Sequence, residues 1–583
     1  MHDHLVKWRM WLVGAVLLAA MCGLAARLGD LHLGNHSRVS RDWETDLLPR
    51  RGTIFDRNGA PLAVSLPCHQ PFLDPLALKP RHDRVQVAAR LAEALNVDMD
   101  RILVGFSATN ARHQLLPVYV DDRTWRALAT NTAVSGVGWE ERIVRTYPQK
   151  THMSGVIGFV SQAGQGGEGG AGIESRYNSY LKGIPGRIEG VVDGMRREMW
   201  DRRRQHVPAV DGASVYLTLD NNIQYRVETE LQQVAAQFNA TAAWALVEKV
   251  ETGEILAMAS WPDFDPNRYG EFGSMDWRNL PLCVNYEPGS TMKSFTIAAA
   301  LNEGAITRAT RLDVGYGSWF YGGRVLRDHC EGVIDTSTAL ARSSNIFNAR
   351  VALLLGNRRL EAYLRGFGFG RRLEIDLPGE EPGILYPARA WNVLTPTRIA
   401  IGQGISVTAV QLLNAYCGLA NGGRLMRPYA VDRVVGSGGQ VLLQGRPCLL
   451  ARPVRPEIAA QVCAMLVGVT EEGGTATRAA VRGYSVAGKT GTSQIPIPGR
   501  GYSDTDYWST FVGLVPAEKP VFGVLVTVER PQPQRMGGFV AAPVFARIAE
   551  SVARYLEIPA TAEAGREVAA AEPPARHAAR GRP

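Results

Sequence analysis

Three short groups of residues combine hydroxyl, amine and amide side chains at spacings that could support acyl transfer. The first is Ser290-Thr291-Met292-Lys293, which follows Pro288-Gly289 and begins a helix-forming run that ends at Gly304. Positions i and i+3 share one helix face, so an uncharged Lys293 could take the Ser290 proton, and the helix N-terminus favours developing negative charge. By itself this pattern is weak, because about half a chance match is expected.

The second group is Ser343-Ser344-Asn345, which stands between two helical patterns. A hydroxyl at Ser343 could relay a proton, and the Asn345 amide could hold a substrate carbonyl. Ser-Asn pairs also commonly cap helices, so this group alone carries little weight.

The third group is Lys489-Thr490-Gly491-Thr492, at the end of an apolar strand pattern. Gly491 lets another backbone approach closely, Lys489 supplies a compact charge, and the hydroxyls of Thr490 and Thr492 can bind a carboxylate. A chance Lys-Thr-Gly is expected only about 0.05 times, so this signal is much stronger.

Lysine is scarce in this chain, which has 8 Lys among 64 basic residues. Arginine serves equally well where only a fixed positive charge is needed, whereas a cation that must lose its proton favours lysine. Two of the few lysines, Lys293 and Lys489, stand where acyl-transfer chemistry asks for that residue. Coincidence is therefore a poor explanation.

Strand and helix patterns around these groups predict an antiparallel sheet covered by helices, an α+β fold. Asn58-Gly59 predicts a hairpin within residues 51–65, and Asp220 is expected to cap a helix that continues to Phe238. Further elements follow. Strands are expected at 242–249, 254–259, 510–515 and 521–528, and helices at 346–355, 408–420 and 540–555.

Residues 10–26 form an uncharged apolar run between Lys7, Arg9 and Arg27. Its length is the lower limit for a membrane-spanning helix, and the basic flank predicts a cytoplasmic N-terminus. A cleavable signal peptide is the alternative, but its apolar core is usually shorter. Both interpretations place the rest of the chain outside the inner face of the membrane.

The amino-acid composition narrows the classes of protein to which this chain could belong. The 583 residues carry a formal charge of +8. They are 45% hydrophobic and 21% charged, with 61 Gly and 33 Pro, which argues against a wholly disordered, collagen-like or multi-span membrane chain. The arginine-rich run at 196–204 is interpreted as a solvated loop, not a nucleic-acid site.

The seven cysteines show no metal or redox spacing, so no metal and no cofactor are expected, and free buried cysteines are predicted. Residues 557–583 are expected to be disordered.

The combination Ser-x-x-Lys, Ser-x-Asn and Lys-Thr-Gly is the signature of β-lactamases and penicillin-binding proteins. The chain resembles a class B penicillin-binding protein from the anchor to about residue 555. The resemblance extends to the three motifs of that family's non-catalytic pedestal, of which the third is the least regular. These motifs contribute Arg51, Gly52, Asp56, Arg57, Gly59, Arg145, Pro148 and Glu174. Glu287, in Tyr286-Glu287-Pro288-Gly289, is closer to the division-type, FtsI-like enzymes.

The resemblance implies a peptidoglycan D,D-transpeptidase that penicillins acylate. Ser290 would be the nucleophile, Lys293 its base and Ser343 the proton relay. Asn345 would hold the donor peptide. The D-alanine carboxylate of a D-Ala-D-Ala stem peptide would bind Lys489, Thr490 and Thr492, beside Gly491, and the N–H groups of Ser290 and Thr492 would form the oxyanion hole. In the pedestal, Arg51 and Glu174 would pair across the hairpin.

The implied organisation is a cytoplasmic tail (1–9), an anchor (10–26), a juxtamembrane segment (27–49), a mixed pedestal (50–210), a transpeptidase domain (211–556) and the tail. Because 27–49 is too short for a glycan-polymerising domain, a SEDS-family, FtsW-like lipid-II polymerase is expected as a membrane partner, with other division proteins. An elongation- or sporulation-type transpeptidase, a carboxypeptidase or other hydrolase, and a non-catalytic penicillin sensor or scaffold remain as alternatives.

Overall fold

The computed structural model describes residues 2–33, 41–74, 81–95, 97–107, 113–116, 118–131, 137–161, 167–192 and 198–561. The chain divides into two compact units. The first holds residues 1–50 and 183–211, and the second holds residues 51–182 and 212–583. The predicted disorder of the tail lies almost wholly outside the described residues, as do parts of the glycine-rich stretch after Gly164 and of the arginine-rich run.

A five-stranded antiparallel sheet forms the core of the second unit, in the order β10-β9-β21-β20-β19. Its strands are β9 (Ala242–Lys249), β10 (Ile255–Trp261), β19 (Ala487–Ile497), β20 (Gly501–Val515) and β21 (Phe522–Glu529). The predicted hairpin between β9 and β10 and the predicted pairing of β20 with β21 are confirmed. Strand β19 lies at the edge of the sheet.

Helices cover both faces of this sheet. Two glycines of the sheet show which helix covers which face. A Cβ atom built on Gly513 would lie 2.5 Å from the side chain of Phe545 in α17 (Gly537–Tyr555). A Cβ atom built on Gly523 would lie 2.8 Å from the side chain of Cys417 in α15 (Ala409–Ala420). Gly523 pairs with Leu514, the neighbour of Gly513, and successive residues of a strand face opposite sides. The helices α17 and α15 therefore cover opposite faces, and the predicted α+β class is confirmed.

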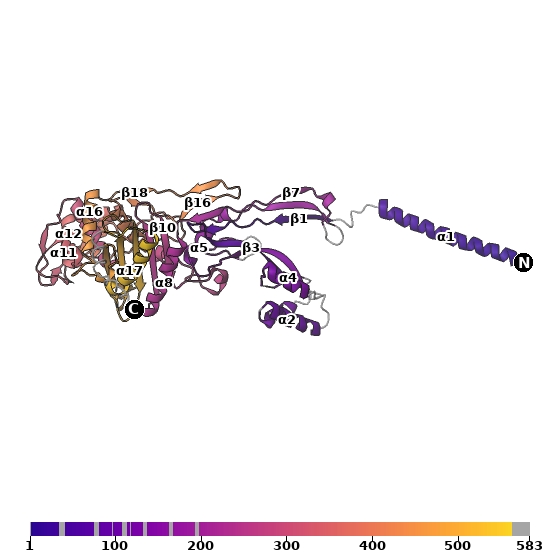
Figure 1. Cartoon of the computed structure of the whole chain (residues 1–583), viewed down its shortest axis with the longest axis horizontal. Helices are drawn as coiled ribbons and strands as arrows, with labels where there is room; N and C mark the ends of the chain where they lie inside the picture. The colour runs from indigo at the N-terminus through magenta and orange to yellow at the C-terminus, as the bar shows by residue number, and fades with distance from the viewer. Residues whose placement is uncertain are drawn as a thin grey trace, which may run out of the picture. The chain divides into compact units, whose positions relative to one another are not determined.

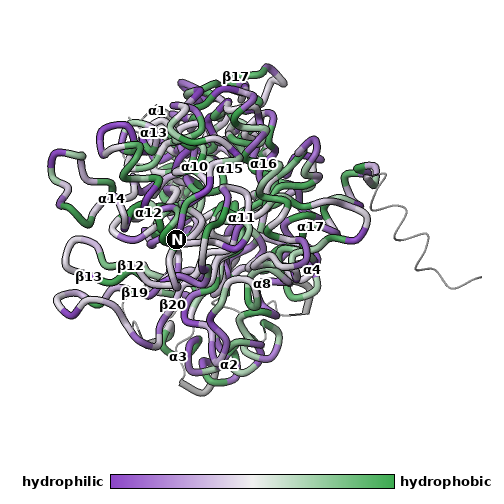
Figure 2. The backbone as a smooth tube through the Cα atoms, turned by 90° about the vertical axis from the view of Figure 1, so that its left-hand side faces the viewer, coloured by the Kyte–Doolittle hydropathy of each residue, from purple (hydrophilic) through white to green (hydrophobic). Residues whose placement is uncertain are grey.

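The helix α8 (Asn221–Gln237) lies beside α17 (Figure 1). The Asp220 side chain accepts hydrogen bonds from the N–H groups of Asn222 and Ile223, so the predicted cap is confirmed. Near α15 lie α10 (Lys293–Asn302) and α16 (Pro456–Val467), and Figure 2 shows the three together. Ring contact between Phe295 and Tyr416 joins α10 to α15.

A seven-stranded mixed sheet runs β17-β16-β8-β2-β3-β4, with β5 also paired to β3. The predicted hairpin forms its centre, because β2 (Ile54–Phe55) and β3 (Pro61–Leu73) are antiparallel, while β2 is parallel to β8 (Ser214–Leu217). The other strands are β4 (Gln114–Leu115), β5 (Val137–Thr146), β16 (Val431–Val435) and β17 (Val441–Gln444). Gly59, at the hairpin turn, has a φ of 85°, which glycine adopts without strain.

The first unit contains the helix α1 (His2–Leu33) and a three-stranded sheet of β1 (Arg41–Leu47), β6 (Gly186–Val192) and β7 (Gln205–Val207). Residues Lys7–Asp30 are long and apolar enough to cross a membrane. The helix is longer than the predicted anchor because it continues through the polar residues on both sides. The prediction of buried cysteines holds for Cys330, Cys417 and Cys463, but it is wrong for Cys448, which is exposed.

Candidate active site

Ser290 lies on a short 3-10 helix, η4 (Gly289–Met292), which continues directly into α10. The approach to this helix requires Gly289, whose φ is 57° and whose added Cβ would lie 3.0 Å from the Thr492 carbonyl oxygen. Ser290 is half-buried, one turn before the fully buried Lys293. The local sequence thus brings the serine to the end of a buried helix, against strand β19.

The hydroxyl of Ser343 accepts hydrogen bonds from two lysines. Lys293 Nζ donates to Ser343 Oγ at 3.0 Å, and Lys489 Nζ donates to the same atom at 2.9 Å. Lys293 Nζ also donates to the Ser343 carbonyl at 2.5 Å and to Asn345 Oδ1 at 2.7 Å. With both lone pairs engaged, Ser343 keeps its own O–H free to donate elsewhere. The structure therefore brings together four of the predicted residues from three distant parts of the chain.

Burial changes the proton affinity of both amines. It lowers the pKa of Lys293 to about 7, although the negative charge of Asp328 acts in the opposite direction. It also lowers the pKa of Lys489, well below the ordinary value, and the nearby Lys293 adds to this effect. A neutral Lys293 is then available near neutral pH, as a general base for a serine requires.

The Lys293 amine does not form the direct contact with Ser290 that the sequence predicted. Among the described residues, no hydrogen bond joins Ser290 Oγ to Lys293 Nζ, because that amine is directed to Ser343 and Asn345. Catalytic hydrogen bonds in unliganded sites are often long and shorten when substrate binds. Proton transfer from Ser290 to Lys293 stays a prediction.

Asp328 is a polar residue at this site that the sequence patterns did not indicate. Its carboxylate accepts hydrogen bonds from the Ser344 hydroxyl and, at 2.7 Å, from the Ile346 N–H. Ser343, just before them, has a φ of 60°, a left-handed conformation that is costly for a serine. Asp328 therefore stabilises the turn that holds the Ser343 hydroxyl, and no local motif around residue 328 could have revealed this.

The residues of the Lys-Thr-Gly group lie on the edge strand β19. A Cβ added to Gly491 would lie 2.7 Å from the Pro288 carbonyl oxygen, so the expected close backbone approach is present. Thr490 Oγ1 lies 3.1 Å from Thr475 Oγ1, and Thr492 Oγ1 accepts a hydrogen bond from the Gly537 N–H at 3.0 Å. Both hydroxyls keep capacity for a further hydrogen bond.

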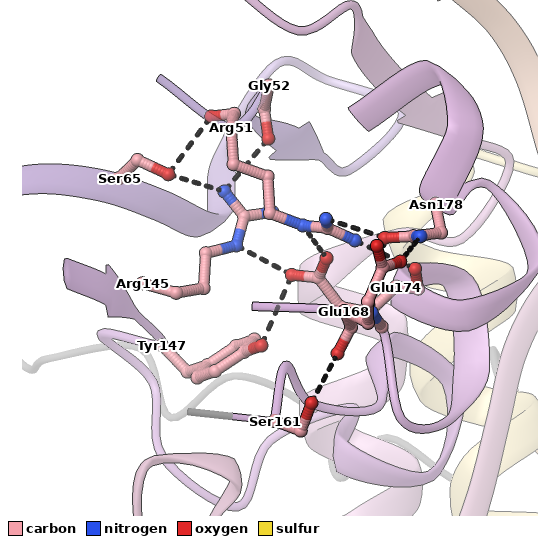
Figure 3. Close-up of polar contacts among 10 residues, drawn as sticks. Arg51, Gly52, Ser65, Arg145, Tyr147, Ser161, Glu168, Glu174 and Asn178 are labelled. Carbon is pink, nitrogen blue, oxygen red and sulfur yellow. Dashed lines mark hydrogen bonds and ion pairs between the residues drawn. The ribbon is translucent and has the colours of Figure 1, made fainter. Parts of the chain in front are cut away.

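In the predicted pedestal, the fully buried Glu174 of α6 (Gly172–Arg176) pairs with two arginines (Figure 3). Arg51 Nε donates to Glu174 Oε2 and Arg145 Nε to Glu174 Oε1, each at 2.6 Å. Tyr147 OH adds a hydrogen bond of 3.2 Å. The Arg51 pair was expected from the sequence, but the joint pairing with Arg145 was not.

The other predicted pedestal residues lie outside this ion-pair cluster. Gly52 packs directly against the backbone of Ala213, because a Cβ atom built on Gly52 would lie only 1.9 Å from the Ala213 carbonyl oxygen. The Asp56 carboxylate accepts from the N–H groups of Asn58, Ala60 and Asn221, and Arg57 lies 3.5 Å from Glu254. Pro148 is exposed just after β5. Asp56 and Arg57 thus connect the hairpin to residues at α8 and before β10.

No group of three or more His, Cys, Asp or Glu side chains suited to a metal ion occurs in the described part of the chain. The groups that the structure brings together at the site are amines, hydroxyls and backbone groups. Together these can activate a serine, bind a carboxylate and donate a proton to a leaving group.

Known proteins are similar to this chain in sequence and in fold. Residues 243–550 match the penicillin binding protein transpeptidase domain, and residues 46–217 match the penicillin-binding protein dimerisation domain. Stage V sporulation protein D of Bacillus subtilis is 32% identical over 514 residues, which cover 86% of this chain and 77% of that protein. Peptidoglycan D,D-transpeptidase FtsI of Escherichia coli is 28% identical over 574 residues, or 96% and 93% of the two chains.

Among solved structures, penicillin binding protein 3 from Mycobacterium tuberculosis, complexed with aztreonam, superposes with a TM-score of 0.69 at 28% identity, over 89% of this chain and 98% of that one. The chain therefore belongs to the penicillin-binding protein transpeptidase family, as a class B, FtsI-like peptidoglycan D,D-transpeptidase. The resemblance inferred from the three motifs is confirmed.

Proposed function

We propose that this chain cross-links peptidoglycan stem peptides in septal wall synthesis, through an acyl-enzyme on Ser290. The observation that supports this most strongly is the convergence of Lys293 and Lys489 on the Ser343 hydroxyl. Each amine comes from a different motif, and both are fully buried. This arrangement suits a serine that must be deprotonated and a leaving group that must be protonated.

The proposed reaction begins when Ser290 Oγ attacks the carbonyl of the D-Ala-D-Ala bond while neutral Lys293 takes its proton. The C–N bond then breaks, and Ser343 donates its proton to the departing D-alanine amine and is reprotonated from Lys293. An acceptor amine of a neighbouring stem peptide then attacks the acyl carbon and gives its proton to neutral Lys293. The ester bond breaks, and that proton returns to Ser290 Oγ. A penicillin would follow the first half and leave Ser290 acylated.

The donor peptide is proposed to lie along strand β19. An edge strand presents unpaired N–H and C=O groups, to which an extended peptide can add as a further strand. Lys489, Thr490 and Thr492 would bind the terminal carboxylate, Gly491 would allow the close approach, and Asn345 would hold the peptide amide. The N–H groups of Ser290 and Thr492 would stabilise the oxyanion, typically by about 2.7–4 kcal/mol per donor.

The proposed location is the inner membrane, with one spanning helix, a cytoplasmic N-terminus and the catalytic part in the periplasm. The apolar span Lys7–Asp30 and the basic residues before it support this topology. A SEDS-family, FtsW-like polymerase that supplies uncross-linked glycan, together with other division proteins, is the proposed partner. β-Lactams would compete with stem peptides for Ser290.

A sporulation-type role is the second candidate, because stage V sporulation protein D is 32% identical to this chain. Depletion in the native bacterium separates the two roles. Filamentation with loss of fluorescent D-amino acid at the septum supports the septal role, whereas normal division with defective spores supports the other.

Transfer and hydrolysis are separated by incubating the full chain in detergent with nascent glycan from a lipid-II polymerase. We expect cross-linked dimers that disappear with Ser290→Ala and with Lys293→Arg. Products trimmed of D-alanine without any dimers would contradict the proposed transfer and favour a carboxypeptidase. A folded wild-type chain without either product would favour the sensor.

A further inference from the structure

A two-stranded hairpin, β12 (Ser318–Tyr321) and β13 (Arg324–Arg327), has two different faces. On one face Trp319 pairs with the buried Leu326, and the Arg350 guanidinium lies 5.2 Å from the centre of the Trp319 ring. This face anchors the hairpin to the rest of the catalytic part. The opposite face of the hairpin is therefore not needed to hold it in place, and apolar side chains there call for another explanation.

The outer face is nevertheless apolar at its centre. Phe320 and Val325 are directly opposite each other, and they are 70% and 54% exposed. The adjacent pair on this face is Ser318 and Arg327, both exposed. Large apolar side chains gathered on a surface commonly mark a binding site.

Tyr316, just before β12, is 94% exposed. It stands between Gly315 and Gly317, whose φ angles are 66° and 72°. Both glycines are held by the backbone, since Gly332 N–H donates to the Gly315 carbonyl at 2.8 Å and Asp328 N–H to the Gly317 carbonyl at 2.9 Å. The ring is thus presented to solvent from a fixed turn.

The hairpin leads directly into the active site. The carbonyl of Arg327 accepts a hydrogen bond from Asn345 Nδ2 at 2.9 Å, and the next residue, Asp328, holds the turn of Ser343. A polymer bound to the hairpin would therefore lie next to the residues that act on its peptides.

The geometry points to Tyr316, Ser318, Phe320, Val325 and Arg327 as a saccharide platform that binds the glycan strand bearing the stem peptides. The apolar C–H faces of sugar rings stack on aromatic rings, while hydroxyl groups pair with Tyr316 and Ser318. The Arg327 guanidinium suits the carboxylates of the attached peptides. The assignment of this ligand rests on the proposed function, because that function supplies a glycan-borne substrate.

The test uses the full chain in detergent and, as probe, soluble peptidoglycan glycan strands whose stem peptides have been removed by an amidase. The double variant Tyr316→Ala/Phe320→Ala is compared with Tyr225→Ala, which removes an exposed aromatic ring from α8. We expect the double variant to bind the strands about tenfold more weakly and the control to bind like wild type. Acylation by a fluorescent penicillin, which has no glycan, should be unchanged in both.

The platform would be overturned if wild type did not bind glycan, if the double variant bound it equally well, or if the control lost binding equally. Wild-type binding of another protein through this face, without binding of glycan, would also overturn it and identify a protein-docking surface. Loss of penicillin acylation in the double variant alone would mean that the hairpin acts on the active-site turn instead. A wild-type chain that binds glycan but is never acylated would contradict the proposed function while leaving the platform supported.

Discussion

Burial gives Lys293 and Lys489 a chemistry that no arginine of this chain could supply. An arginine remains protonated at any physiological pH, whereas a buried lysine can become neutral. The amines also meet at one hydroxyl, so both cannot be charged there without strong repulsion. Catalysis by these side chains therefore depends on which protons they hold.

The first prediction concerns the pH dependence of acylation. The pKa of Lys293 is lowered to about 7, so the neutral base accumulates as pH rises through that value. We expect the second-order rate constant for penicillin acylation to rise about tenfold per pH unit below pH 7 and to level off above it. Lys293→Arg should acylate at least about a thousandfold more slowly at every pH. A flat profile between pH 5 and 8 would argue against Lys293 as the base.

The second prediction concerns Asp328. Because its charge raises the pKa of Lys293, Asp328→Asn should move the acid limb of the acylation profile to lower pH. Loss of the carboxylate that holds Ser344 and Ile346 should also lower the plateau rate, by about tenfold. Stopped-flow acylation from pH 5 to 9 measures both effects. Glu331→Gln, a change at an exposed carboxylate nearby, is the matched control and should move neither.

At the scale of the element, strand β9 carries a carboxyl group that the reaction does not use. Glu248 is buried and accepts a hydrogen bond from Asn414 Nδ2 at 2.7 Å, and burial raises its pKa to about 8. The unfolded chain releases this proton near pH 4.5, whereas the folded chain keeps it until about pH 8. Folding stability must therefore fall as pH rises through this window.

The third prediction follows from this sign. In wild type, Glu248 should lower the free energy of unfolding by roughly 1.4 kcal/mol for each pH unit between about pH 5 and 8. Glu248→Gln has no carboxyl group at this position, so it should not show this decrease. Urea unfolding at pH 5 and pH 8 measures it, with the exposed Glu471→Gln as control. Equal changes in the two variants, or a variant less stable than wild type at pH 8, would contradict the expected protonation of Glu248.

The elements could be predicted where local signals were strong. Asp220 before an apolar repeat predicted α8, and Asn58-Gly59 predicted the central hairpin. The three active-site groups were recognisable because lysine is rare in this chain. The structural role of Asp328 could not be predicted, because its partners lie 16 and 18 residues away and a hydrogen bond across a loop leaves no periodic pattern.

Within the second unit as a whole, polar contacts connect the pedestal residues to the catalytic part. The Glu174 carboxylate accepts hydrogen bonds from Arg51, Arg145 and Tyr147. Tyr177, the residue directly after α6, donates a hydrogen bond of 3.3 Å to Asp376. Asp376 in turn accepts from the N–H groups of Ala430 and Val431 at the start of β16. The pedestal is therefore expected to influence the stability of the catalytic part.

The fourth prediction tests this network with a double-mutant cycle of Arg51→Gln and Glu174→Gln. Glu174→Gln leaves the Arg51 and Arg145 guanidinium groups without their buried counter-charge, so this variant should lose about 3–5 kcal/mol of unfolding free energy. Arg51→Gln leaves Glu174 paired with Arg145, so this variant should lose less. The double variant should lose less than the sum, with a coupling of at least about 1 kcal/mol. Additive losses would count against a pair that sets the pedestal's pose.

The proposed function depends on an acyl-enzyme at Ser290. Its most direct test is labelling of the full chain with a fluorescent penicillin, followed by peptide mass spectrometry of wild type and Ser290→Ala. We expect one adduct, on Ser290, that is absent from the variant. A folded wild-type chain without an adduct, or with an adduct on another serine, would contradict it.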